Sequence, residues 1–365
     1  MGLSRKRSTS HHAQCAQIID QYEVANAVIA ASQGNRVRRG LVRGVAYVSA
    51  VLLASYLACV VYAYLPYPEL SREALLQPGD RLARVEGHAL RYRTYPSILV
   101  PARPTLILLH GFAGSLHAWD RVAPGLSEVA NVVAVDLMPF GLSDKPLDFA
   151  YSYRSQARII GGLVEVLGIR DPVPMGHSYG GTIAAYMAWL NPRVSRVVLV
   201  DPGIQSTGIP GFVRHMFFPM ARVGARMFGA HGFRRRFLAK SFVDKQLVTE
   251  ELVRGISRGT DMQGYLEGTS AFLSQYSDVE VEGLLAGIKA KALLVWGEHD
   301  RNNPIANAKS MAERLPEAAT AIIKHSGHYP HWERPREVVE AVSAFLQRTA
   351  STRPLAARPP EKVSP

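Results

Sequence analysis

A serine between two glycines constrains the fold of this chain more than any other feature. Residues 176–180 read Gly-His-Ser-Tyr-Gly, which is the pattern G-x-S-x-G. The short apolar run 173–175 precedes it, and a run of helix-forming residues follows and ends at Asn191-Pro192. Glycines on both sides of Ser178 allow a very tight turn. We therefore predict a strand, a sharp turn with Ser178 at its apex, and a helix, an arrangement that presents a nucleophilic serine.

A serine hydroxyl is a weak nucleophile at neutral pH, so this interpretation requires a base and an orienting carboxylate elsewhere in the chain. Asp300 follows a predicted buried strand at 292–296, and His328 follows a predicted strand at 321–323. The order along the chain is Ser178, Asp300, His328. These three residues form a candidate catalytic triad.

A glycine-rich turn supplies a possible site for oxyanion donors. The buried strand predicted at 105–109 ends in His110-Gly111-Phe112-Ala113-Gly114-Ser115. A turn of this kind at the end of a central strand can present a backbone N–H group to the reaction centre.

Several motifs in this order resemble the α/β-hydrolase family over roughly residues 80–348. The resemblance implies a mostly parallel sheet with helices on both faces and a helical cap. The motifs that carry it are His110-Gly111-Phe112, Gly141-Leu142-Ser143-Asp144-Lys145-Pro146, the turn at Ser178, Gly297-x-x-Asp300, and Gly327-His328-Tyr329-Pro330 with Glu333-Arg334-Pro335.

The same resemblance implies a role for each candidate residue. Ser178 would be the nucleophile, His328 the general base and then the acid, and Asp300 the group that fixes the tautomer of the imidazole. The backbone N–H groups of Phe112 and Tyr179 would form the oxyanion hole. Haloalkane dehalogenases and epoxide hydrolases of this fold use aspartate as the nucleophile, so Ser178 argues against both.

Two of these assignments have rivals in the sequence. His331 lies three residues beyond His328 and could be the base, although only His328 matches the Gly-His-x-Pro pattern of the family. Asp201 ends a predicted strand at 196–200 and also lies between Ser178 and His328. We prefer Asp300 as the acid and expect Asp201 to be structural.

Two prolines depart from the expected pattern. Pro172 and Pro174 fall in the strand that carries the serine turn. Proline cannot donate a hydrogen bond to a sheet, so we expect the strand to be short or bulged there.

The amino-terminal part predicts a membrane anchor. Residues 44–65 contain no charged side chain, and a helix of this length spans about 33 Å, close to the thickness of a bilayer's hydrocarbon core. Arginines 36, 38, 39 and 43 precede the segment, whereas only Arg72 follows within fifteen residues. The positive-inside rule predicts a cytoplasmic amino terminus and an extracytoplasmic hydrolase domain. Over forty residues precede the apolar run, which argues against a cleaved signal peptide.

Charge and cysteine content agree with this topology. The formal net charge is +12, of which residues 1–43 contribute +5. We attribute this charge to contact with anionic lipid, because no nucleic-acid-binding motif accompanies it. Both cysteines, Cys15 and Cys59, lie outside the exported part, so no disulfide is needed there. No cysteine cluster or paired-histidine helix indicates a metal site or a cofactor.

The sequence thus divides into a basic arm at 1–43, an anchor at 44–65, a hydrolase domain at 66–348 and a disordered tail at 349–365. About ninety residues separate the strands that end at 200 and begin near 292, so we expect a helical cap at about 204–288. Residues 211–240 carry seven basic residues and no acidic ones, interleaved with phenylalanines and methionines. This mixture suits either contact with lipid or an apolar lining over the pocket.

The predicted function is hydrolysis of a carboxylic ester, with an apolar or lipid-like substrate at the membrane. Serine-dependent carbon–carbon hydrolases and cofactor-free haloperoxidases remain alternatives, because their triads match this one. A non-catalytic binding protein is a further alternative, against which the complete set of triad candidates argues.

Overall fold

The computed structural model describes residues 6–96, 99–100, 103–205, 219–275, 281–315 and 317–350. The chain separates into two compact units, one ending at Tyr64 and the other beginning at Leu65. The first unit is helix α1 (Lys6–Tyr64), which extends the apolar segment back through the predicted basic arm. Its part from Arg38 to Tyr64 is, by length and composition, long and apolar enough to cross a membrane.

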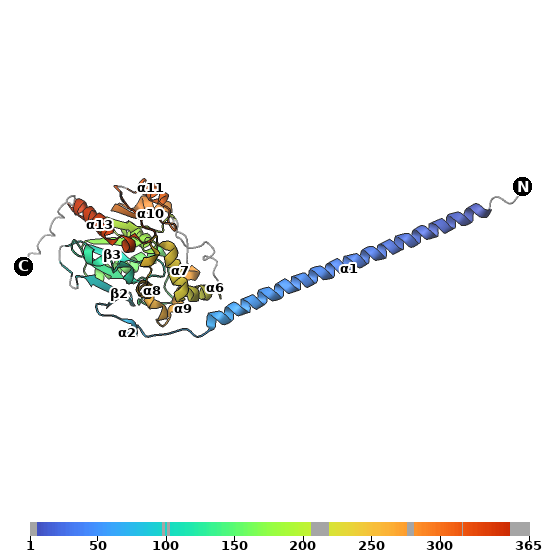
Figure 1. Ribbon diagram of the computed structural model, residues 1–365, viewed down its shortest axis with the longest axis horizontal. Helices are drawn as coiled ribbons and strands as arrows, with labels where there is room; N and C mark the ends of the chain where they lie inside the picture. Colours follow the sequence, from blue (N-terminus) through green and yellow to red (C-terminus); the bar gives the residue numbers. More distant parts are fainter. Residues whose placement is uncertain are drawn as a thin grey trace, which may run out of the picture. The chain divides into compact units, whose positions relative to one another are not determined.

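An eight-stranded sheet forms the centre of the second unit (Figure 1). Its strands run in the order β1-β2-β4-β3-β5-β6-β7-β8. Strand β2 is antiparallel to β1 and β4, and the remaining pairs are parallel. This confirms the predicted mostly parallel sheet. The strands are β1 (Arg81–Val85), β2 (His88–Tyr95), β3 (Thr105–Leu109), β4 (Asn131–Val135), β5 (Pro172–His177), β6 (Arg196–Val200), β7 (Lys291–Gly297) and β8 (Ala319–Ile323).

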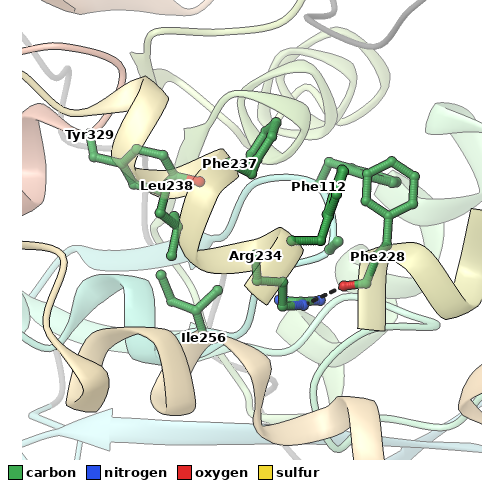
Figure 2. A pocket seen from close by; sticks show the side chains of 9 residues that line it. Phe112, Phe228, Arg234, Phe237, Leu238, Ile256 and Tyr329 are labelled. Carbon is green, nitrogen blue, oxygen red and sulfur yellow. Dashed lines mark hydrogen bonds between the residues drawn. The ribbon is translucent and has the colours of Figure 1, made fainter. Parts of the chain in front are cut away.

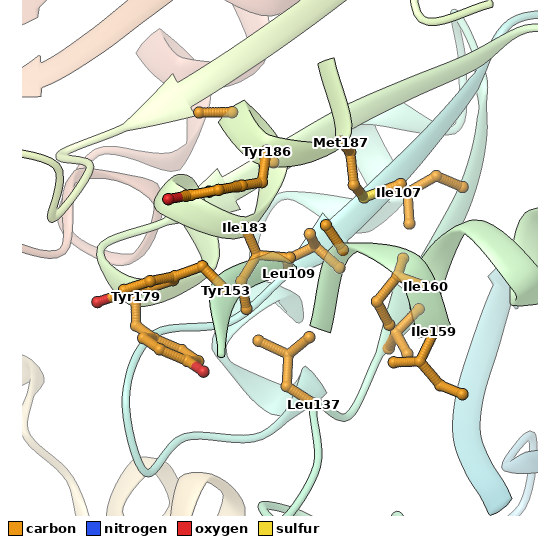
Figure 3. Packing of buried hydrophobic residues seen from close by; sticks show 14 of the residues in the cluster. Ile107, Leu109, Leu137, Tyr153, Ile159, Ile160, Tyr179, Ile183, Tyr186 and Met187 are labelled. Atoms are coloured by element: carbon orange, nitrogen blue, oxygen red, sulfur yellow. The ribbon is translucent and has the colours of Figure 1, made fainter. Parts of the chain in front are cut away.

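Helices cover both faces of the sheet because both faces of its central strands are apolar. In β3, Ile107 and Leu109 belong to one buried cluster, while Leu106 and Leu108 belong to the other. The first cluster includes side chains of α4 (Tyr153–Val166), α5 (Tyr179–Leu190), α10 (Val281–Gly287) and α11 (Ala306–Ala312). Figure 3 shows Ile183 and Met187 of α5 packed with Ile107 in this cluster. The second cluster lies under α3 (Ala123–Leu126) and α13 (Pro335–Ala350).

The prolines of β5 lie where one neighbouring strand has not yet begun to pair. Strand β5 pairs with β3 along its length, with Thr105 opposite Pro172. Its pairing with β6 starts only at Met175. The Ser178 N–H donates to Val200 of β6, so by the alternation of a strand the nitrogens of Pro172 and Pro174 face the same side. The missing N–H groups therefore cost no sheet hydrogen bond, and the strand accommodates both prolines without being shortened.

A group of helices between β6 and β7 forms the cap. Figure 1 shows α6, α7, α8 and α9 gathered at one end of the sheet. They are α6 (Met220–Gly229), α7 (His231–Ser241), α8 (Glu250–Ser257) and α9 (Tyr265–Gln275), with single 3₁₀ turns at Lys245–Leu247 and Arg258–Asp261. Parts of the predicted cap, residues 206–218 and 276–280, lie outside the described residues, as does the predicted tail from 351 onward.

The segment that follows α1 is bonded to this cap. The Arg226 guanidinium of α6 donates to the carbonyl oxygens of Leu65 (2.7 Å) and Pro66 (3.1 Å) and lies over the ring of Tyr67. Leu70 exchanges backbone hydrogen bonds with the 261–263 turn at 2.7 and 2.9 Å. The short helices α2 (Arg72–Leu75), Leu116–Trp119 and α12 (Pro330–Glu333) complete this unit.

Candidate active site

Ser178 occupies a strained turn between β5 and α5. Its backbone has φ 51° and ψ −115°, a conformation that non-glycine residues seldom adopt and that functional sites often contain. A β-carbon at Gly176 would collide with the carbonyl of Gly180, and one at Gly180 would collide with the carbonyl of Leu109. Both glycines of the motif are thus required by close backbone contacts. The strand, turn and helix predicted around Ser178 are all present.

The loops after β7 and β8 bring Asp300 and His328 into contact. The Oδ2 atom of Asp300 lies 2.7 Å from Nδ1 of His328, and both side chains are buried. The other carboxylate oxygen accepts hydrogen bonds from the backbone N–H groups of Asn302 (2.7 Å) and Asn303 (3.0 Å). Burial opposes the charge on Asp300, but His328 and these donors outweigh it and lower the pKa of the carboxyl group.

His177 joins the turn of Ser178 to the loop of His328. Its Nε2–H donates to the His328 carbonyl at 2.6 Å, and the two rings lie 4.7 Å apart. On the other side, a β-carbon at Gly111 would lie 3.4 Å from Cβ of Ser178. The glycine-rich turn, Ser178 and the Asp300–His328 pair are therefore neighbours at the carboxyl edge of the parallel strands.

His110 organises the glycine-rich turn and does not transfer protons there. Its Nδ1–H donates to the Gly111 carbonyl at 2.8 Å, and its Nε2 accepts from the Leu137 N–H at 2.9 Å. Burial lowers the pKa of His110, so the ring is neutral. Within the described part of the chain, no acceptor bonds the backbone N–H of Phe112. The turn thus presents this predicted oxyanion donor beside Ser178.

A family model described as alpha/beta hydrolase fold matches residues 104–335. The chain belongs to the alpha/beta hydrolase fold family. The match spans the motifs on which the sequence resemblance rests, and it confirms that resemblance.

Relatives of this hydrolase fall into more than one class. An uncharacterized hydrolase of Bacillus subtilis (strain 168), YugF, is 30% identical over 274 residues, which are 72% of this chain and 96% of the relative. A 2-hydroxy-6-oxononadienedioate/2-hydroxy-6-oxononatrienedioate hydrolase of Burkholderia vietnamiensis (strain G4 / LMG 22486) is 28% identical over 260 residues, covering 67% and 87% of the two chains. Among solved structures, a membrane phospholipase A described as a bacterial virulence factor is 27% identical with a TM-score of 0.60, covering 87% of this chain and 99% of its own.

His331 and Asp201, the alternatives to His328 and Asp300, do not form the carboxylate–imidazole contact that joins Asp300 to His328. His331 is fully buried, its ring is tilted against that of Trp119 with the centroids 4.5 Å apart, and neither of its ring nitrogens has a partner among the described residues. Burial lowers the pKa of His331 to about 3. The carboxylate is bonded to His328 and not to His331, so the geometry favours His328 as the base.

Asp201 lies beside Asp300, the carboxylate that contacts His328. The side-chain ligand atoms of Asp201, Asp300 and His328 all lie within 4.8 Å of one another. The Oδ1 atom of Asp201 accepts the Gly297 N–H at 3.0 Å. Burial, reinforced by the charge of Asp300, holds the pKa of Asp201 well above its usual value. Burial and the neighbouring charge thus favour the protonated form of Asp201 and the ionised form of Asp300.

Glu333 holds the loop of His328 in place, a role that the sequence did not predict. The sequence indicated Glu333-Arg334-Pro335 only as part of the family resemblance. Its two oxygens accept the backbone N–H groups of Gly327 (2.6 Å), Val243 (2.8 Å) and Asp244 (3.0 Å). The His328 N–H also donates to the carbonyl of Ser241 in the cap, at 2.9 Å. These bonds connect the loop of His328 to the end of α7.

An apolar cavity lies between the cap and the glycine-rich turn (Figure 2). Its free volume is about 20 Å³, room for roughly one water molecule, so a substrate chain must displace side chains to enter. Only one charged side chain, Arg234, is among the described residues that line it. The others are Phe112, Ala113, Phe228, Phe233, Phe237, Leu238, Ile256 and Tyr329.

Two groups in the described residues have side-chain spacing that could hold a metal ion. One consists of Asp201, Asp300 and His328, in which Nδ1 of His328 is engaged with the Asp300 carboxylate. The other, Glu298, His299 and His325, lies largely on the surface. The sequence pattern indicated neither group, because each is assembled from separate loops.

Proposed function

We propose that this chain is a serine hydrolase that cleaves carboxylic esters at Ser178. The observation that carries the proposal is the buried Asp300–His328 pair, joined through His177 to the strained turn of Ser178. Because Nδ1 of His328 is bonded to Asp300, the opposite ring nitrogen, Nε2, is the atom that accepts the proton of the serine.

The reaction would proceed through an acyl-enzyme. Ser178 Oγ attacks the ester carbonyl while its proton passes to His328, and the resulting imidazolium is stabilised by Asp300. The carbon–oxygen bond breaks, and His328 returns the proton to the leaving alcohol. A water molecule deprotonated by His328 then attacks the acyl carbon, which releases the acid and restores Ser178.

The backbone N–H groups of Phe112 and Tyr179 would stabilise the oxyanion. The Phe112 N–H belongs to the turn that His110 fixes, and the Tyr179 N–H begins helix α5 directly after the nucleophile. Both are positioned by the main chain, so they need no reorganisation during the reaction. Loss of one such donor typically lowers turnover by about 10²- to 10³-fold.

An apolar or lipid-like ester is the substrate class that the surroundings support. The cavity beside the glycine-rich turn is lined mainly by phenylalanine and aliphatic side chains. The apolar helix, the bonds between the cap and residues 65–70, and the likeness to a membrane phospholipase all favour a substrate taken from a lipid surface.

The proposed topology has residues 1–43 in the cytoplasm, a single membrane span at 44–65, and the hydrolase domain at 66–348 on the opposite side. The arginines that precede the span support this orientation. Alkaline-phosphatase and green-fluorescent-protein fusions at the carboxyl end test it. Fluorescence without phosphatase activity would reverse the proposed orientation.

Carbon–carbon bond hydrolysis is the second candidate. Three relatives named as hydrolases of 2-hydroxy-6-oxo-dienoates support it, with identities of 28%, 27% and 26%. A shared triad serves either reaction, so the choice depends on the substrate pocket.

The test compares substrates on detergent-solubilised full-length protein and its Ser178→Ala variant. p-Nitrophenyl esters from acetate to palmitate are assayed beside 2-hydroxy-6-oxo-6-phenylhexa-2,4-dienoate. We expect Ser178-dependent ester cleavage that increases with acyl length. Cleavage of the dienoate with no turnover of any ester would replace the first proposal with the second.

A further inference from the structure

Arg234 places a buried positive charge at the wall of the apolar cavity. The residue lies on α7, and only 7% of its surface is exposed. Figure 2 shows it beside Phe228 and Ile256, with its guanidinium directed toward the carbonyl of Phe228. The other described residues that line the cavity are uncharged.

No carboxylate neutralises this charge in the part of the chain that the structure describes. Some buried arginines contact an acidic side chain, as Arg91 does with Asp136 and Arg196 with Asp171, whereas Arg226 donates to the backbone carbonyls of Leu65 and Pro66. Of the two parts of the cap outside the described residues, 206–218 include no aspartate or glutamate, whereas 276–280 include Asp278 and Glu280. A buried charge without a partner is costly, and such charges are normally paired or bind a ligand.

The described partners of the guanidinium are a backbone carbonyl and the side chain of Tyr265, with which it shares a hydrogen bond. A guanidinium has five N–H donors. The Nε–H donates to the Phe228 carbonyl at 2.6 Å, which fixes the orientation of the group at the end of α6. If Arg234 served only to cap the end of α6, its bond to the Phe228 carbonyl would be enough. That role gives no reason for the charge to line a cavity.

The charge also lies close to the reaction centre. Burial raises the pKa of Tyr329, the residue after His328, and the charge of Arg234 acts against that rise. The cavity reaches from Arg234 to Phe112 and Ala113 of the glycine-rich turn. A substrate at Ser178 whose apolar arm displaces the side chains of this small cavity would therefore meet the guanidinium.

We infer that Arg234 is an anion-binding residue of the substrate pocket, and that the preferred substrate is an amphiphilic ester carrying a phosphate or carboxylate group beside an apolar chain. The claim that the bound molecule is a substrate rests on the proposed ester hydrolysis. The claim that Arg234 binds an anion does not. The planar guanidinium, held at Nε, would offer its remaining donors to two oxygens of the anion.

Calorimetric titration of the full-length Ser178→Ala protein tests this binding without requiring turnover. The ligands are hexyl phosphate, hexanoate, hexanol and inorganic phosphate, all at monomeric concentrations in non-ionic detergent. We expect hexyl phosphate or hexanoate to bind about 10- to 100-fold more tightly than hexanol, as befits a hydrogen bond to a charged group. Addition of Arg234→Gln should abolish that preference, while hexanol binding changes little.

Arg236→Gln is the matched control, because Arg236 lies on the same helix, is exposed, and also bonds a backbone carbonyl, that of Gly232. It should leave every affinity unchanged. Equal affinity for hexanol and the two anions, or equal losses in both arginine variants, would overturn the inference. Inorganic phosphate binding as tightly as hexyl phosphate would also overturn it, since the apolar chain would then contribute nothing.

Two further comparisons separate the possible failures. If Arg234→Gln does not fold, Arg234→Lys keeps the charge and should still prefer the anions over hexanol, and no preference in that variant refutes the inference. Anion preference combined with no Ser178-dependent ester cleavage by the wild-type protein would refute the proposed function alone.

Discussion

Replacement of Asp300 by asparagine should disable His328 by fixing the wrong tautomer. One carboxylate oxygen accepts two backbone N–H groups, from Asn302 and Asn303, and the other contacts Nδ1 of His328 at 2.7 Å. In Asp300→Asn, the amide oxygen will keep the two backbone bonds, because an amide nitrogen cannot accept them. The NH₂ group then faces His328 and donates to Nδ1. The proton of the ring moves to Nε2, which can no longer accept the proton of Ser178.

The expected loss is large. A neutral amide in this position of a serine triad lowers kcat by about 10⁴-fold in the serine proteases, for the same tautomeric reason. That factor corresponds to about 5.5 kcal/mol of transition-state stabilisation. The rate of Ser178 labelling by a fluorophosphonate is the assay of choice, because it reports activation of the nucleophile without knowledge of the substrate. Hydrolysis of p-nitrophenyl butyrate provides the second readout.

Asp201→Asn is the matched control for this prediction. Two ionised carboxylates within 4.8 Å of each other would repel by at least about 3.5 kcal/mol at an effective dielectric constant of about 20, which favours the protonated form of Asp201 beside Asp300. Asparagine can replace a protonated acid as a donor and can still accept the Gly297 N–H. We expect its labelling rate to fall by less than about 10-fold. A larger loss in Asp201→Asn than in Asp300→Asn would refute the assignment of the acid.

Three other predictions follow from particular contacts. Because the pKa of Asp201 is raised on folding, this residue stabilises the wild-type protein below about pH 3.8, its pKa in the unfolded chain, and the contribution is lost as the pH rises through the folded pKa. Tm of Asp201→Asn should therefore rise relative to wild type from pH 4 upward. A Tm difference that does not change with pH would contradict this. His331→Phe should retain labelling within about 10-fold and lose no Tm, because its buried ring nitrogens have no partner among the described residues; inactivation would reinstate His331 as a base. Gly176→Ala should abolish labelling through collision with the Gly180 carbonyl, whereas Gly161→Ala on α4, where a β-carbon meets nothing within 4 Å, should be neutral or stabilising by about 0.5–1 kcal/mol; equal behaviour of the two variants would refute the steric argument.

Local patterns in the sequence were sufficient for the central strands and for the serine turn. The runs at 105–109 and 196–200 match β3 and β6 residue for residue, because a strand buried on both faces is apolar throughout and ends at polar or turn-forming residues. The glycines around Ser178 indicated its turn for a similar reason, since backbone collisions exclude other residues. The antiparallel strands β1 and β2 were not predicted, because their burial is uneven and their sequence carries charged residues.

The choice between Asp300 and Asp201, and between His328 and His331, needed the tertiary structure. Each pair lies in the permitted order along the chain, and residue type alone does not separate a bonded carboxylate from its protonated neighbour.

The sequence by itself determined the fold class, the tight turn at Ser178 and the existence of one long apolar helix. Periodicity, glycine spacing and length are properties of contiguous residues, and they fix such local features. Only the tertiary structure decided which carboxylate faces which imidazole, that Glu333 ties the loop of His328 to the cap, and that Arg234 lines an apolar cavity. Those features depend on side chains from distant segments meeting in a low-dielectric interior, where charge and hydrogen bonding are set by neighbours and not by sequence order.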